Sequence, residues 1–215
     1  MINIDKLPNN IQNFIKGIDY SDFSCSKEAK VYFINKDNGY FLKIANSGTL
    51  QTEAIMTEYF FSKGLAAKVC NYINSENDYL ITEKIPGKDG TADCFINNPL
   101  KLCEIFAETL LNLHQLDISD CPLKSITTKF VSDPVFDTLI HGDYCLPNII
   151  LNDFKFSGLI DLDHAGIGDK HRDIDSALRT LKRNLKTNEY NNYFLECYGK
   201  NRIDPNRQLI WLRAE

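Results

Sequence analysis

Short apolar runs separated by turn residues dominate the first half of the chain and predict a β-rich segment. Asp37-Asn38-Gly39 lies between two of these runs and predicts a hairpin, because Asn-Gly accepts the positive φ angles of a tight turn. Residues 50–63 have the pattern of a helix, and Gly64 is a typical stop. Strands are expected at residues 31–34, 40–44, 68–73 and 79–84.

Helical periodicity replaces this pattern in the second half of the chain. Asp204 followed by Pro205 is a typical helix start. Two short apolar runs, 149–151 and 159–160, flank the polar residues 152–157, and this arrangement predicts another hairpin. Helices are expected at residues 99–114, 173–185, 189–198 and 205–213.

The change from strands to helices falls at Pro86-Gly87-Lys88-Asp89-Gly90, a stretch that disfavours helix. We therefore expect an α+β fold with two lobes. A small, antiparallel, β-rich N-terminal lobe would span residues 1–86, and a mainly helical C-terminal lobe containing the second hairpin would span residues 87–215. A nucleotide would bind between them, as ligands often do at domain boundaries.

Composition and charge narrow the class of protein. The chain has 215 residues, 43% hydrophobic and 25% charged, which is typical of a globular protein with a real core. A net charge of -5 argues against a general nucleic-acid-binding surface. No run has membrane-spanning length, and residues 1–10 lack the pattern of a signal peptide. Seven cysteines without a C-x-x-C pair favour a reducing compartment, so we expect a cytoplasmic protein without zinc.

The most informative pattern is His141-Gly142-Asp143 followed by Asn148 and, after the hairpin, Asp161. A His-Gly-Asp triplet alone is usually only a turn. Here the hairpin would bring the loop before its first strand close to the residue after its second strand. One aspartate can then orient a hydroxyl nucleophile while the asparagine and the other aspartate hold Mg²⁺ on a nucleotide. The combination therefore indicates phosphoryl transfer.

Lys43 stands in an otherwise apolar predicted strand, and Glu53 lies early in the helix that follows. Each has an ordinary explanation, since a strand lysine can face solvent and an acidic residue is favoured near a helix N-terminus. Together they match the strand-lysine and helix-glutamate ion pair that positions nucleotide phosphates in kinases. We predict that these two side chains meet.

The segments around Lys43 and Glu53 and from His141 to Asp161, in this order along the chain, resemble the aminoglycoside phosphotransferase family and in particular its 3′-phosphotransferase branch. The resemblance implies a protein-kinase-like fold and transfer of the γ-phosphate of ATP or GTP to a hydroxyl of an aminoglycoside, a cationic small molecule. The residues that carry the match are 141–151 and 158–175, and the catalytic loop is its most specific part. Further matches lie at residues 41–43, 53, 80–87 and 113–122, and the single matches at Lys43 and Glu53 are weaker.

The resemblance also implies a role for each matching residue. Asp143 would be the catalytic aspartate, which accepts or orients the hydroxyl proton. Asn148 and Asp161 would bind Mg²⁺, and Lys43, held by Glu53, would contact the α- and β-phosphates. Further nucleotide contacts would come from Phe41 stacked on the base, from the backbone between Glu83 and Ile85, and from Ser26 in a phosphate-covering loop.

Two departures from the family concern the acceptor. Only residues 123–140 stand where the family has a longer helical insert that builds much of the aminoglycoside-binding wall, and the C-terminus stops before the family's usual acidic ending. The acidic candidates for contacts with substrate amines are Asp120, Asp163 and Glu215. Two alternatives therefore stay open: a kinase for another small hydroxyl compound, and a non-catalytic nucleotide-binding remnant.

Overall fold

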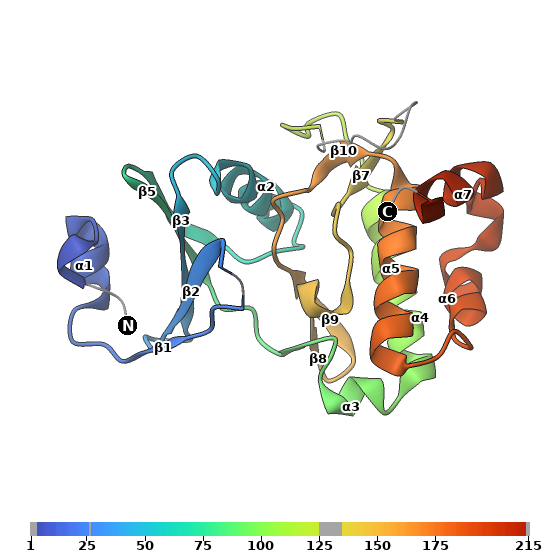
Figure 1. Ribbon diagram of the computed structural model, residues 1–215, viewed down its shortest axis with the longest axis horizontal. Coiled ribbons are helices and arrows are strands. Elements are labelled where there is room, and N and C mark those ends of the chain that lie inside the picture. Colours follow the sequence, from blue (N-terminus) through green and yellow to red (C-terminus); the bar gives the residue numbers. More distant parts are fainter. Residues whose placement is uncertain (1–3, 26, 125–134, 214–215) are drawn as a thin grey trace.

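The computed structural model describes residues 4–25, 27–124 and 135–213. A β-rich N-terminal part and a mainly helical C-terminal part lie side by side along the long axis (Figure 1). The fold is therefore α+β, as predicted. The α-helices are α1 (Asn9–Ile15), α2 (Gln51–Ser62), α3 (Asp93–Ile96), α4 (Pro99–His114), α5 (Lys170–Leu185), α6 (Asn191–Tyr198) and α7 (Pro205–Arg213).

A five-stranded antiparallel sheet forms the N-terminal part. The Asp37-Asn38-Gly39 turn joins its central hairpin as predicted, but the positive φ angles fall on Asp37 (49°) and Gly39 (96°) rather than on Asn38 and Gly39. The four predicted strands are present, and the short first strand is an addition that the sequence pattern did not reveal. In spatial order the strands are β1 (Tyr20–Asp22), β2 (Ala29–Ile34), β3 (Tyr40–Asn46), β5 (Asn77–Glu83) and β4 (Val69–Asn74).

The two faces of this sheet are covered by different helices. Successive side chains of a strand point to opposite faces, so Leu42 and Lys43 of β3 diverge. Leu42 is fully buried in a cluster with Ile11 and Ile15 of α1. Ala45, on the same face as Lys43, packs with α2 instead. The lysine is thereby directed to the side of the sheet where α2 lies.

The second predicted hairpin is formed by β8 (Ile149–Asn152) and β9 (Lys155–Leu159). Its turn has only two central residues, Asp153 and Phe154, with φ 49° and 55°. The predicted polar connection over residues 152–157 was thus too long, because two residues of positive φ close the turn and leave the rest to β9. Three short strands complete this part: β6 (Lys88–Asp89) pairs with β8, and β7 (Thr138–Ile140) pairs with β10 (Gly166–Gly168).

The predicted bounds of α4 and α7 are confirmed. Helix α5 begins at Lys170, earlier than predicted, because the carboxylate of Asp169 caps it by accepting the N–H of His171. Helix α6 begins at Asn191 rather than Glu189. None of the helices in the described part of the chain has the length and apolar composition needed to span a bilayer.

The largest apolar core extends from the helices of the C-terminal part into α2. Met56, Tyr59 and Phe60 of α2 share this cluster with α4, the hairpin and α5. The link continues past α2, where the N–H of Leu159 donates to the carbonyl of Leu65 at 2.7 Å. Helix α2 is therefore packed against both parts of the molecule. The boundary at residue 86 stays a prediction.

Neighbouring phenylalanines of α2 provide a test of this packing. Phe60 is fully buried, whereas Phe61 is 46% exposed. Phe60→Ala should lower the free energy of unfolding by about 3–5 kcal/mol, because it leaves a cavity in the core. Phe61→Ala should change it by less than about 1 kcal/mol. Denaturant unfolding measures both, and equal losses would contradict the placement of α2.

Candidate active site

The loop from His141 to Asn148 connects β7 to β8 and is hydrogen-bonded to α5. Asp173 of α5 is fully buried. Its two carboxylate oxygens accept the backbone N–H groups of His141 at 2.7 Å and of Gly142 at 2.8 Å. Although burial raises the pKa of Asp173, the hydrogen bond and charge of His114 and the hydrogen bond from the His141 backbone bring it below its usual value. Asp173 is thus ionised, and its carboxylate accepts hydrogen bonds from two backbone N–H groups of the loop.

Gly142 is required where it stands. Its φ is 83°, in the left-handed region that favours glycine. A Cβ added there would lie 2.2 Å from the backbone oxygen of His164, a contact that no side chain can make. The loop therefore passes against the segment after the hairpin without room for a side chain.

Asp143 follows Gly142 and its side chain is exposed. The side-chain N–H of Asn148 donates to the Asp143 carbonyl at 3.1 Å and to Asp143 Oδ2 at 3.2 Å. The Asp143 N–H donates to His141 Nδ1 at 3.3 Å, so Nε2 carries the histidine proton and donates to the carbonyl of Ile160 at 3.0 Å. The carboxylate is oriented by its neighbours and still open to solvent.

Asn148 and Asp161 are brought together by the hairpin. The N–H of Ile160 donates to the carbonyl of Asn148 at 3.0 Å, and Asp161 is the next residue, with φ 62°. Asn148 is buried, and because its nitrogen faces Asp143, its Oδ1 is directed to the other side. The structure thus gathers Asp143, Asn148 and Asp161 around the end of the hairpin.

These residues supply the kind of donors that a hard cation prefers. Carboxylate and amide oxygens suit Mg²⁺, which usually takes only one or two protein carboxylates together with phosphate oxygens and water. In the described part of the chain no group of three or more His, Cys, Asp or Glu side chains is arranged for a metal ion. The carboxylate of Asp161 and the amide oxygen of Asn148 are donors that suit a metal ion bound together with a nucleotide.

Lys43 and Glu53 meet as predicted, and Asp161 joins them. Lys43 Nζ lies 2.7 Å from Glu53 Oε2 and 2.7 Å from Asp161 Oδ1. Burial opposes the charge of Lys43, but the two carboxylates raise its pKa above the usual range. Burial likewise raises the pKa of Asp161, yet Lys43 brings it below the usual value. Glu53 is the most deeply buried of the three, and burial raises its pKa to about 7 against the opposing effect of Lys43.

The predicted nucleotide contacts are placed as follows. Phe41 lies on the same face of β3 as Lys43, with its ring centroid 5.5 Å from that of Phe33. The backbone N–H of Glu83 is engaged with Lys68 O at 3.0 Å. Ile85 packs closely on Gly158 of β9. Ser26 lies outside the described residues.

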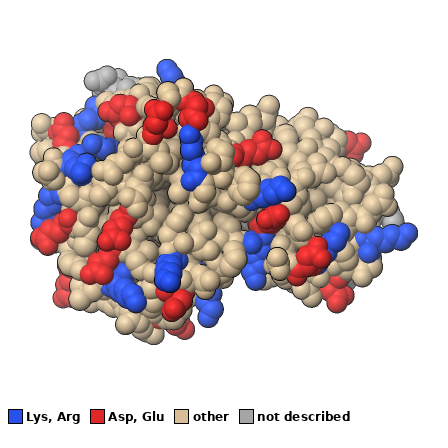
Figure 2. Space-filling model, turned by 180° about the vertical axis from the view of Figure 1, so that it is seen from behind, with Lys and Arg blue, Asp and Glu red and all other residues tan. Residues whose placement is uncertain are grey.

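The acidic candidates for the acceptor site differ in their surroundings. Asp120 accepts hydrogen bonds from Lys63 at 2.7 Å and from the Tyr59 hydroxyl at 2.9 Å. Asp163 Oδ2 is 3.7 Å from His164 Nε2, and Glu215 lies outside the described residues. Acidic and basic side chains alternate over the face shown in Figure 2 without forming one continuous stripe of either sign. Asp163 is the candidate that has no cationic lysine or arginine among these contacts.

One supporting residue had no recognisable role in the sequence. His114 is the last residue of α4. Its Nε2 lies 3.3 Å from Asp173, and its Nδ1 2.9 Å from the Tyr198 hydroxyl. No sequence pattern links three residues so far apart in the chain, although His114 lies within a segment that carried the family resemblance.

Comparison with known proteins relates this chain to phosphotransferases. The model of the phosphotransferase enzyme family matches residues 132–202, which include the loop, the hairpin and α5. A probable aminoglycoside 3′-phosphotransferase of Lactococcus lactis is 39% identical, over 96% of this chain and 93% of its own length. The chain belongs to the aminoglycoside phosphotransferase family.

Other aminoglycoside phosphotransferases are similar in sequence or in fold. The aminoglycoside 3′-phosphotransferase of Niallia circulans is 30% identical over 64% of this chain and 66% of its own. The crystal structure of aminoglycoside-3′-phosphotransferase of type VIII superposes with a TM-score of 0.82 at 20% identity, covering 98% of this chain and 97% of the other. The structure of an aminoglycoside phosphotransferase of Streptomyces rimosus in complex with ADP and streptomycin superposes with a TM-score of 0.76 at 16% identity. The superposition covers 100% of this chain and 98% of the other. This phosphotransferase thus has the kinase-like fold of its family.

The position of Glu53 predicts a pH dependence of this phosphotransferase's stability. The pKa of Glu53 rises from 4.5 to about 7 on folding. Between these values the folded protein binds more protons than the unfolded chain, so its free energy of unfolding falls as pH rises, by at most about 1.4 kcal/mol per pH unit. Glu53→Gln should remove this contribution, and Glu58→Gln, at an exposed position of the same helix, should keep it. Urea unfolding from about pH 5 to about pH 7 measures the slopes, and indistinguishable slopes for all three proteins would contradict the prediction.

Proposed function

We propose that this chain transfers the γ-phosphate of ATP or GTP to a hydroxyl group of an aminoglycoside. The observation that carries the proposal is the convergence of Asp143, Asn148, Asp161 and Lys43 at the end of the hairpin, in a member of a phosphotransferase family. Phosphoryl transfer requires positioning and neutralisation of charge more than covalent chemistry by the protein. These side chains supply both.

In this proposal Asp143 orients the acceptor hydroxyl and takes up its proton. Its exposure lets an acceptor approach, and the hydrogen bond from Asn148 fixes its direction. The negative charge of the nucleotide phosphates is neutralised by the ammonium group of Lys43, which Glu53 holds at 2.7 Å. Mg²⁺ bound through the oxygens of Asn148 and Asp161 would add further neutralisation of the nucleotide phosphates.

The base of the nucleotide would lie between the two lobes, against the ring of Phe41. Since the N–H of Glu83 is already used within the sheet, we assign contacts with the base to the Glu83 carbonyl and the Ile85 N–H. All seven cysteines are free thiols, which suits a reducing compartment, and we propose that the reaction takes place in the cytoplasm.

The acceptor is the part of the proposal that rests most on relatives. The relatives in sequence are mainly named aminoglycoside 3′-phosphotransferases, and one is named streptomycin 3″-kinase. The match to the Lactococcus lactis protein runs over 243 positions, more than the 215 residues of this chain, so that relative has residues without a counterpart here. The short stretch 123–140 is why another hydroxyl compound is the second candidate acceptor.

An acceptor panel tests the proposal. The purified chain is given Mg²⁺ with ATP or GTP and, separately, kanamycin, neomycin, streptomycin, choline, homoserine and simple sugars. Formation of a phosphate ester is followed by ³¹P nuclear magnetic resonance. Esters formed only with aminoglycosides support the proposal. Esters formed only with the other compounds identify a different small-molecule kinase, and nucleotide binding without any ester points to a non-catalytic remnant.

Replacement of the proposed catalytic aspartate should abolish transfer without unfolding the protein. Asp143→Asn keeps the size and an oxygen acceptor for Asn148 but removes the proton acceptor, so kcat should fall by about 10²–10⁴. Asp153→Asn, at the exposed turn of the β8–β9 hairpin that follows Asp143, should leave kcat unchanged. Steady-state kinetics and thermal unfolding measure the two effects, and near-normal turnover by Asp143→Asn would refute the assignment.

A further inference from the structure

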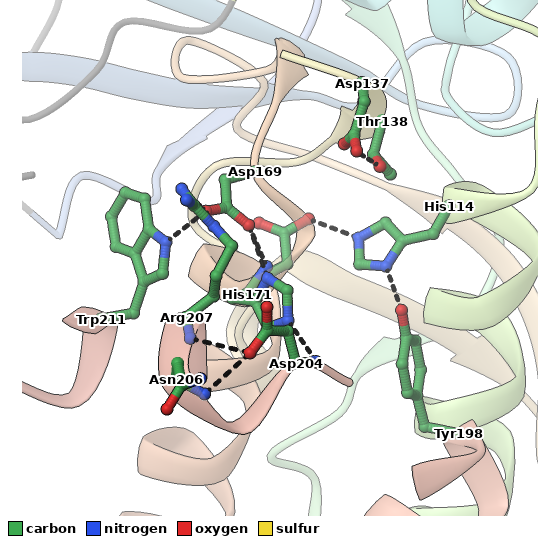
Figure 3. Close-up of polar contacts among 11 residues, drawn as sticks. His114, Asp137, Thr138, Asp169, His171, Tyr198, Asp204, Asn206, Arg207 and Trp211 are labelled. Carbon is green, nitrogen blue, oxygen red and sulfur yellow. Dashed lines mark hydrogen bonds and ion pairs between the residues drawn. The ribbon is translucent and has the colours of Figure 1, made fainter. Parts of the chain in front are cut away.

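One buried carboxylate joins the start of α5 to the last helix, α7 (Figure 3). Asp169 is only 4% exposed. Its Oδ1 accepts the backbone N–H of His171 at 3.0 Å and lies 2.7 Å from His171 Nδ1. Its Oδ2 accepts from Arg207 Nε at 2.8 Å, from Arg207 Nη2 at 2.6 Å and from Trp211 Nε1 at 2.8 Å. A charge so deeply buried is stable only when it is paired and fully hydrogen-bonded, and α7 supplies three of these five donors.

The charge state of this carboxylate agrees with the geometry. Burial raises the pKa of Asp169, but the hydrogen bonds from His171, Trp211 and Arg207 outweigh it and hold the pKa well below the usual range. The carboxylate is therefore an anion that depends on α7 for its partners.

His171 makes a second connection between the same two helices. Because its Nδ1 donates to Asp169, its Nε2 is the acceptor, and it receives the backbone N–H of Asp204 at 3.0 Å. Asp204 in turn caps α7, accepting the N–H of Asn206 at 2.8 Å. The N-terminus of α7 and its inner face are thus both fixed to the first turn of α5 (Figure 3).

This first turn of α5 also carries the support of the proposed catalytic loop. Asp173 is four residues, about one helical turn, beyond Asp169. Its oxygens hold the N–H groups of His141 and Gly142, the two residues directly before Asp143. Protein interiors are close-packed, so a shift of the first turn is passed to the groups that it touches. The first turn of α5 therefore joins two sets of buried polar contacts, those of Asp169 with α7 and those of Asp173 with the loop.

We propose that Arg207 and Trp211 are positioning residues for Asp143, acting through Asp169 and Asp173. In this role they would act without touching nucleotide or acceptor. They hold the first turn of α5 in the position in which Asp173 accepts the loop N–H groups of His141 and Gly142. The effect on turnover rests on the proposed function, whereas the effect on the loop does not. Both residues lie beyond residues 132–202, the part matched by the family model.

Two conservative variants and a matched control test this proposal. Arg207→Lys keeps a positive charge but loses the two-pronged hydrogen bond, and Trp211→Phe keeps an aromatic ring but loses the indole N–H. Arg179→Lys is the control, because Arg179 also pairs with a buried aspartate of α5, Asp175, at 2.9 Å. Hydrogen–deuterium exchange of the His141 and Gly142 amides is measured for each protein, together with kcat, KM for nucleotide and thermal unfolding.

Arg207→Lys and Trp211→Phe should make the two loop amides exchange at least about tenfold faster and lower kcat by about tenfold or more, with the KM for nucleotide unchanged. Arg179→Lys should change neither the exchange nor kcat. Faster exchange confined to α7 and the start of α5, with normal protection of the loop, would overturn the proposal. If the wild type forms no phosphate ester, the proposed function fails, and the exchange measurement still decides whether α7 positions the loop. If Arg207→Lys unfolds the chain, the milder Trp211→Phe decides.

Discussion

The ammonium group of Lys43 lies 2.7 Å from a carboxylate oxygen of Glu53 and 2.7 Å from one of Asp161. These contacts join strand β3 and helix α2, which follows it, to Asp161 after the hairpin, 118 residues beyond Lys43. Removing charged groups from water is costly unless they are paired, so the three side chains determine one another's positions. Because Phe60 anchors α2 in the core of the C-terminal part, the pair is also fixed relative to the loop that bears Asp143. In the proposed function, the placement of the phosphate and acceptor groups depends on this connection.

The residues around the connection are not arranged for maximal stability. Asp161 has a left-handed backbone conformation, with φ 62°, and Gly142 adopts one that only glycine tolerates at such close contact. Glu53 is buried deeply enough that its pKa rises to about 7 in spite of the adjacent lysine. Local costs of this kind are common where a structure holds reactive groups in place. Here the apolar core beneath the hairpin and the hydrogen bonds of Asp173 offset them.

Local patterns were sufficient for much of the fold and for the main chemical residues. The period of α4, the Asp-Pro start of α7 and the Asn-Gly turn each depend on residues adjacent in sequence, and all three are present. The convergence at the second hairpin followed from a simple property of hairpins, that both ends lie together. Strand β1 was missed because a short edge strand with polar side chains has no clear alternation. The early start of α5 was missed because its cap, Asp169, was read as part of a motif rather than as a helix boundary. Contacts between distant residues, such as His114 with Asp173 or Trp211 with Asp169, leave no local pattern to read.

The central claim is that Asn148 and Asp161 bind one divalent ion on a nucleotide whose phosphates Lys43 contacts. A crystal structure with Mg²⁺ and a non-hydrolysable nucleotide analogue tests it most directly. We expect both side chains to be direct ligands of one ion, with Lys43 on the phosphates and Asp143 facing the terminal phosphate. An ion bound elsewhere, or Asn148 and Asp161 turned away from a nucleotide that is fully bound, would contradict the account.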